Sequence, residues 1–150
     1  MNGEPITILL VEDEPAHAEI VRRNFEELRL ANRLVHVADG QAALDYLHRR
    51  GSFADPATSP RPGLILLDLR LPKVDGQEVL KTVKADPTLC SIPVVILTTS
   101  AMDADMVKAY DNHANSFLTK PVDHLQFVAL MESLGYYWLA WNRHPYEPQR

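Results

Sequence analysis

Four short apolar runs constrain the fold of this chain more than any other feature. They cover residues 8–11, 64–67, 94–97 and 116–119, and patterns typical of amphipathic helices separate them. Apolar runs of this length that alternate with helices are typical of parallel strands buried on both faces. With a fifth run at residues 34–37, which His36 interrupts, the pattern predicts an α/β fold with one parallel sheet of five strands.

Chemically active side chains stand at the ends of these apolar runs. They are Glu12, Asp13, Asp68, Thr98 and Lys120. Because ligands of open parallel sheets bind at the carboxyl ends of the strands, we expect these side chains to meet at one edge. Three carboxylates held together repel one another unless a cation lies among them, and oxygen ligands suit Mg²⁺. The sequence therefore predicts a hard-metal site (Mg²⁺ or Mn²⁺) with a reactive carboxylate.

Composition limits the possible classes of protein. The chain has 150 residues, of which 46% are hydrophobic and 23% charged, and this predicts a single domain over residues 1–150. A formal charge of −5 without a compact basic patch argues against nucleic-acid binding. No apolar run approaches the ~20 residues of a membrane span. The single cysteine, Cys90, cannot form an intramolecular disulfide, so we expect a cytoplasmic protein.

Five helices are expected between and after the strands. They begin at Pro15, surround residues 43–47, cover about 77–85 and 103–110, and start again at residue 123. The proline-rich segment 51–63 is predicted to be a surface loop.

The last helix carries more apolar surface than a single sheet requires. Apolar residues recur from residue 127 to residue 141 at helical spacing, and aromatic residues extend the stripe into an expected tail at about 135–150. One interpretation is that the aromatic side chains fold back onto the domain. The other is a homodimer or partner face, because Tyr and Trp are enriched in such contacts. That face would comprise Leu130, Leu134, Tyr137, Trp138 and Trp141.

Four motifs together resemble a response-regulator receiver domain. They are Val11-Glu12-Asp13, Leu67-Asp68-Leu69-Arg70-Leu71-Pro72 followed by Asp75-Gly76, Leu97-Thr98-Thr99, and Phe117-Leu118-Thr119-Lys120-Pro121. The resemblance extends over about residues 7–137. Only the segment between Asp13 and Asp68 is longer than usual, by about one loop. The resemblance implies a flavodoxin-like, doubly wound sheet with strand order 2-1-3-4-5.

The resemblance also implies a role for each residue of the site. Asp68 would accept a phosphoryl group from a histidine kinase. Asp13 and Asp68 would bind the metal directly, Arg70 through its backbone carbonyl and Glu12 through water. Lys120 would supply a fixed positive charge and precede a cis peptide bond to Pro121. Thr98 and Thr99 would bind the phosphoryl oxygens, and Phe117 would be the switch aromatic.

Three rival interpretations predict different chemistry. A flavin binder would share the strand order, but Glu12, Asp13 and Glu14 would repel the flavin phosphate. A haloacid-dehalogenase-type phosphatase requires a second Asp two residues after its nucleophile, where this chain has Arg70. A degenerate receiver that acts only by binding would have lost an acid or the lysine, and this chain keeps them all.

Less specific features of the sequence indicate a narrower group within this family. The Thr98-Thr99-Ser100 triplet, the long 51–63 loop and the aromatic last helix resemble the stand-alone regulators that are paired with phytochrome-type histidine kinases. The partner implied by this resemblance is such a kinase. The sequence leaves the downstream output and the lifetime of the phosphoryl group open.

Overall fold

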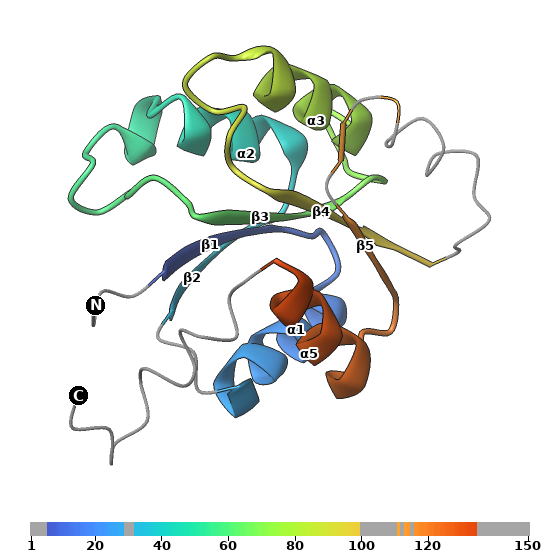
Figure 1. The fold of residues 1–150 in the computed structure, drawn as a ribbon. Helices are drawn as coiled ribbons and strands as arrows, with labels where there is room; N and C mark the ends of the chain where they lie inside the picture. Colours follow the sequence, from blue (N-terminus) through green and yellow to red (C-terminus); the bar gives the residue numbers. More distant parts are fainter. Residues whose placement is uncertain (1–5, 29–31, 100–110, 112, 115, 135–150) are drawn as a thin grey trace.

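A five-stranded parallel sheet forms the centre of the protein in the computed structural model (Figure 1). The structure describes residues 6–28, 32–99, 111, 113–114 and 116–134. The strand order is β2-β1-β3-β4-β5, and every pairing is parallel, which confirms the predicted topology. The strands are β1 (Ile6–Val11), β2 (Asn32–Val37), β3 (Leu64–Asp68), β4 (Val94–Thr98) and β5 (Ser116–Thr119).

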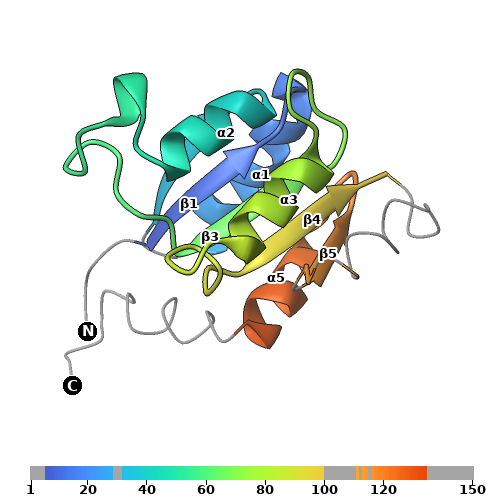
Figure 2. The ribbon, with the colours of Figure 1, turned by 90° about the horizontal axis from the view of Figure 1, so that it is seen from above.

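Helices cover both faces of this sheet. Among the described residues they are α1 (Pro15–Leu28), α2 (Gly40–Leu47), α3 (Gly76–Ala85) and α5 (His124–Ser133), with a short 3₁₀ turn at Gly51–Phe53. Figures 1 and 2 show α1 and α5 on one face and α2 and α3 on the other. The helix predicted at residues 103–110 lies outside the described residues. None of the described helices combines the length and the apolarity that a bilayer crossing requires.

The central strands are apolar throughout because both of their faces are buried. Along β1, Leu9 and Val11 contact the core beneath α2 and α3, whereas Ile8 and Leu10 contact the core beneath α1 and α5. Successive side chains of a strand point to opposite faces. In a strand between two helical layers, every side chain therefore faces an apolar core. The polar residues of the central strands are therefore left for the strand ends.

The helix α5 belongs to the core of its own chain. Phe127 and Met131 are fully buried, and the Phe127 ring meets Phe25 of α1 edge to face at 4.6 Å. Leu130 is only 6% exposed, which corrects its assignment to an exposed interface face. Leu134 packs partly buried against the same core. The other residues assigned to that face, Tyr137, Trp138 and Trp141, lie outside the described residues.

The 51–63 segment runs over the surface, as predicted, and is anchored at several points. The Tyr46 hydroxyl donates to the Pro60 carbonyl at 2.8 Å, and the Gly63 amide donates to the Thr7 carbonyl at 2.8 Å. The guanidinium of Arg61 donates to the Thr88 carbonyl and to the Ser91 hydroxyl. These contacts hold the loop at the amino ends of the strands, away from the candidate site.

Candidate functional site

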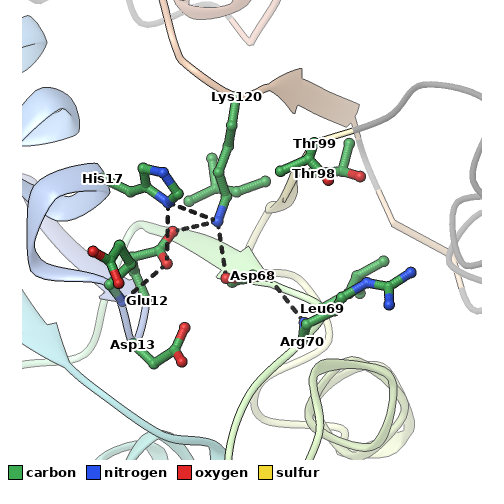
Figure 3. Close-up of a pocket in the computed structure, with 11 residues that line it drawn as sticks. Glu12, Asp13, His17, Asp68, Leu69, Arg70, Thr98, Thr99 and Lys120 are labelled. Carbon is green, nitrogen blue, oxygen red and sulfur yellow. Dashed lines mark hydrogen bonds and ion pairs between the residues drawn. The ribbon is translucent and has the colours of Figure 1, made fainter.

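An open cavity of about 260 Å³ lies at the carboxyl edge of the sheet (Figure 3). The strand ends bring all five predicted side chains to it: Glu12, Asp13, Asp68, Thr98 and Lys120. The convergence of these side chains, predicted from the strand ends, is confirmed.

The sheet register fixes where each group stands. Asp68 is the last residue of β3 and lies beside Leu97 of β4. The next residue of β4, Thr98, pairs with Thr119, and its carbonyl accepts the backbone N–H of Lys120 at 2.6 Å. Glu12 follows β1 directly, and its amide donates to the carbonyl of Val37 at the end of β2. The positions of the side chains are therefore set by hydrogen bonds between strands.

Lys120 bridges two of the acids. Its Nζ lies 2.9 Å from Glu12 Oε1 and 2.9 Å from Asp68 Oδ2, and its side chain is only 8% exposed. Burial by itself would lower the pKa of Lys120, but hydrogen bonds and charge attraction from Glu12 and Asp68 together raise it above its usual value. The lysine is therefore a permanent cation in this cavity.

Glu12 occupies the least solvated position of the site. Its side chain is fully buried, and its Oε2 accepts the backbone N–H of Glu14 at 3.2 Å. Burial raises the pKa of Glu12, and the nearby Asp68 charge raises it further, although Lys120 opposes both. The buried carboxylate therefore lacks enough positive charge around it.

The arrangement of acids fits a hard divalent cation. Carboxylate oxygens from Glu12, Asp13 and Asp68 all lie within 4.8 Å of one another. A Mg²⁺ here would be held directly by Asp13 and Asp68 and through water by Glu12, and it would supply positive charge that offsets these carboxylates. Four acids line the cavity, Glu14 included, against the two cations Lys120 and Arg70, and the charge balance therefore favours a bound cation.

The phosphoacceptor candidate, Asp68, has both carboxylate oxygens held. Oδ1 accepts the backbone N–H of Arg70 at 2.9 Å, and Oδ2 accepts from Lys120. The Asp68 residue is 6% exposed, yet its side chain lines the open cavity. Arg70 also lines that cavity, whereas metal binding by its carbonyl stays a prediction.

The predicted switch residues occupy two different places. Thr98 and Thr99 line the cavity, Thr98 buried and Thr99 exposed. Phe117 is half-buried and packs against the core beneath α2 and α3, so it does not reach the cavity. The peptide bond between Lys120 and Pro121 is cis, as predicted.

Sequence reasoning missed a histidine in this site. His17, in the first turns of α1, lines the cavity, and its Nδ1 lies 3.3 Å from Lys120 Nζ. The same atom is 3.8 Å from Glu12 Oε2. His36 was also missed: its Nε2 lies 2.6 Å from the Glu12 carbonyl oxygen. The position of His17, one helical turn after Asp13, was the only signal in the sequence.

Comparison with known proteins agrees with this geometry. The family model described as response regulator receiver domain matches residues 8–132. The probable methanogenesis regulatory protein FilR2 of Methanothrix harundinacea is 48% identical over 144 residues, which are 95% of this chain and 89% of FilR2.

Two solved structures are similar along nearly their whole length. The Mn²⁺-bound form of response regulator Rcp1, a Synechocystis protein, superposes with a TM-score of 0.75 at 40% identity and covers 90% of this chain and 95% of its own. The phosphorylated cyanobacterial phytochrome response regulator RcpA gives 0.76 at 39% identity and covers 91% and 95%.

Proposed function

Since the chain belongs to the response-regulator receiver domain family and is a phosphoacceptor switch of a two-component system, we propose that Asp68 is the residue that receives the phosphoryl group. One observation carries this assignment. Asp68 ends a buried strand with each carboxylate oxygen held by a fixed donor, and it faces an open cavity of about 260 Å³. The side chain is thus oriented towards a donor that arrives from solvent.

The proposed reaction forms one bond and breaks one. A carboxylate oxygen of Asp68 bonds to phosphorus, the bond from phosphorus to the kinase histidine nitrogen breaks, and its electron pair leaves with that nitrogen. Phosphoryl transfer asks a protein mainly for alignment and for compensation of charge on the phosphoryl oxygens. Lys120 supplies a cation beside Asp68, and Thr98 supplies a hydroxyl at the cavity wall.

A divalent metal fits the remaining charge of the site. We propose that Glu12, Asp13 and Asp68 hold Mg²⁺, or Mn²⁺ as in the Rcp1 structure, with Asp13 and Asp68 as direct ligands and Glu12 acting through water. When bound, the metal supplies positive charge that neutralises the carboxylates and the phosphoryl oxygens. Without it, the negative phosphodonor meets a cavity whose lining has more acids than cations.

The phosphatase alternative is not supported. The receiver family model covers the segment that contains all the site residues, and the haloacid-dehalogenase type needs an acid where this chain has Arg70. We propose that the protein catalyses only its own phosphorylation and dephosphorylation.

The proposed partner is a sensor histidine kinase of the phytochrome type, in the cytoplasm. The similarity to RcpA, a phytochrome response regulator, supports this pairing. We also propose that Thr98 and Phe117 transmit the phosphorylation state to the surface formed by the predicted helix at 103–110, β5 and α5. The homodimer through the last helix stays a proposal for Leu134, Tyr137, Trp138 and Trp141, and light scattering of variants with these residues made polar tests it.

The experiment is self-phosphorylation with acetyl phosphate and Mg²⁺, followed by intact-protein mass spectrometry. We expect one phosphoryl group per chain on the wild type and none on Asp68→Asn or in excess EDTA. Asp55→Asn is the matched control, because Asp55 is an exposed acid of the 51–63 loop. Labelling that survives Asp68→Asn would refute the assignment.

A further inference from the structure

The ammonium group of Lys120 has three neighbours that can accept its hydrogens. Two are the carboxylates of Glu12 and Asp68, each at 2.9 Å. The third is the imidazole of His17, whose Nδ1 lies 3.3 Å from Nζ (Figure 3). An ammonium group has three N–H donors and no acceptor. Asp68 and His17 lie at hydrogen-bond geometry from Nζ, whereas the Glu12 contact is an ion pair, because Glu12 Oε1 has no hydrogen-bond partner among the described residues.

The chemistry of the contact settles the direction of the hydrogen bond. Because Lys120 can only donate, Nδ1 of His17 must be the ring nitrogen that carries no proton. Nδ1 is 3.8 Å from Glu12 Oε2, which is too long for a hydrogen bond. The lysine is therefore the hydrogen-bond partner of this ring nitrogen, and Glu12 Oε2 lies only at ion-pair distance from it.

The surroundings of His17 restrict its ring. Behind the site lies a small, mostly apolar recess, whose wall includes Ile20, Val21 and Pro121. His17, Glu12 and Lys120 line both this recess and the main cavity, so they form part of the partition between the two. The side chain of His17 is 38% exposed, so its outer edge reaches solvent while Nδ1 faces inward.

We propose that His17 is a positioning residue for Lys120: its Nδ1 holds the ammonium group at the place from which it serves the phosphoryl group on Asp68. This inference deepens the proposed function and rests on it. Without the third acceptor, the ammonium group is shared between two carboxylates and can tilt towards either. When Asp68 becomes an acyl phosphate, one of those carboxylates changes, and Glu12 and His17 are the anchors that persist.

The test compares an acceptor-free variant with one that keeps an acceptor. His17→Leu removes the ring nitrogens, whereas Asn at this position places an oxygen close to where Nδ1 stood. With acetyl phosphate and Mg²⁺, we expect His17→Leu to lower the maximal phosphorylation rate about tenfold, with the KM for donor changed less than about threefold. His17→Asn should recover the rate to within about threefold of the wild type.

His48→Leu is the matched control, since it removes a half-buried histidine that pairs with Asp86 on the other helical layer. That control should leave the rate unchanged. A general loss of folding would lower the melting temperature and affect both leucine variants, whereas a positioning effect separates them.

A second measurement does not need phosphorylation. In the resting protein the ¹⁵N NMR signal of the Lys120 ammonium group should shift, and its hydrogens should exchange faster, in His17→Leu and much less in His17→Asn. If the wild type takes no phosphoryl group, the proposed function fails, and this measurement still decides the contact. An unchanged signal and rate in His17→Leu, or equal behaviour of the Leu and Asn variants, would overturn the proposal.

Discussion

Lys120 and Lys84 lie at opposite ends of the sheet and differ in what surrounds their charge. Lys120, after β5, donates to the carboxylate of Asp68 and forms an ion pair with Glu12. Lys84, near the end of α3, donates to the carbonyls of Cys90 and Ile92 at 3.3 and 3.2 Å, just before β4 begins. Burial lowers the pKa of Lys84, whereas the two carboxylates raise that of Lys120 in spite of burial.

The difference shows how one fold separates stability from chemistry. Around Lys84, the charge meets backbone carbonyls, which are fixed and neutral. At the carboxyl ends, charge meets other side chains, which an incoming metal or phosphoryl group can replace or neutralise. Only the charges at the carboxyl ends of the strands change their balance when a ligand binds. The phosphorylation site is therefore suited to that end of the sheet.

Substitution of each lysine by methionine gives the largest expected contrast. Lys120→Met leaves two carboxylates without their cation, and we expect a loss of about 3 kcal/mol in the free energy of unfolding without metal. The rate of phosphorylation should fall at least about 100-fold. Lys84→Met should change the free energy of unfolding by no more than about 1 kcal/mol, because the loss of two hydrogen bonds is partly offset by the removal of a half-buried charge.

Urea denaturation in EDTA and acetyl phosphate labelling with Mg²⁺ measure the two effects. Mg²⁺ should restore part of the stability lost in Lys120→Met, since it supplies the missing positive charge. Equal losses of stability and rate in the two variants would erase the contrast between the two ends.

Two glycines sharpen the same contrast through the backbone. A Cβ on Gly76 would lie 2.4 Å from the Asp68 carbonyl oxygen and 2.4 Å from Leu69 Cα. Gly76→Ala must therefore displace the backbone that carries Asp68, and we expect about 2–3 kcal/mol of destabilisation with slower phosphorylation. Gly51 has φ of +59° and nothing within 4 Å of a Cβ, so Gly51→Ala should cost about 1 kcal/mol and leave phosphorylation unchanged.

Thermal melting and labelling rates of the two alanine variants test this pair. Normal labelling in Gly76→Ala would mean that the Asp68 backbone tolerates displacement.

Most of the fold could be predicted because the central strands are buried on both faces. The runs in β3 and β4 have no polar interruption, and their bounds were predicted to within one residue. The edge strand β2 begins two residues before the predicted 34–37, at the polar residues Asn32 and Arg33, where the apolar pattern gives no signal. Side chains at the strand ends followed from the same reasoning, since the topology alone brings them together.

Contacts between helices and the site were harder to predict. His17 is one half-exposed histidine in a helix, and only the position of α1 beside Lys120 gives it a role. The apolar stripe of α5 was too wide for one sheet because the helix also packs against α1, where Phe127 meets Phe25. Leu130 was placed on an interface for this reason, although it covers the core.

The dependence of stability on pH tests the charge balance at Glu12. Its pKa is raised in the folded state, mainly by burial. The folded state therefore favours the neutral form of Glu12. Its contribution to the free energy of unfolding is full at pH values below the unfolded pKa of about 4.3, and it is lost as the pH rises through the raised pKa of the folded state. In EDTA, the free energy of unfolding of the wild type should fall over that window, and Glu12→Gln should remove the fall.

Glu78→Gln serves as the control, since Glu78 is an exposed acid in the first turn of α3. Saturating Mg²⁺ should suppress the fall in the wild type, because the metal favours ionised carboxylates. Urea titrations at several pH values measure the free energy of unfolding. If it still falls with rising pH in Glu12→Gln, the titration belongs to another group.

The smallest expected effect concerns the anchor of the 51–63 loop. Tyr46→Phe removes the hydroxyl that donates to the Pro60 carbonyl at 2.8 Å and keeps the ring, which meets Phe53 at 5.2 Å between centroids. Because one neutral hydrogen bond is lost and packing is retained, the free energy of unfolding should fall by about 1 kcal/mol. The rate of phosphorylation and its Mg²⁺ dependence should equal those of the wild type, since this end of the sheet has no part in the charge balance of the site. A slower rate in a variant that melts normally would show that the two ends are coupled, and the separation of stability from chemistry would not hold.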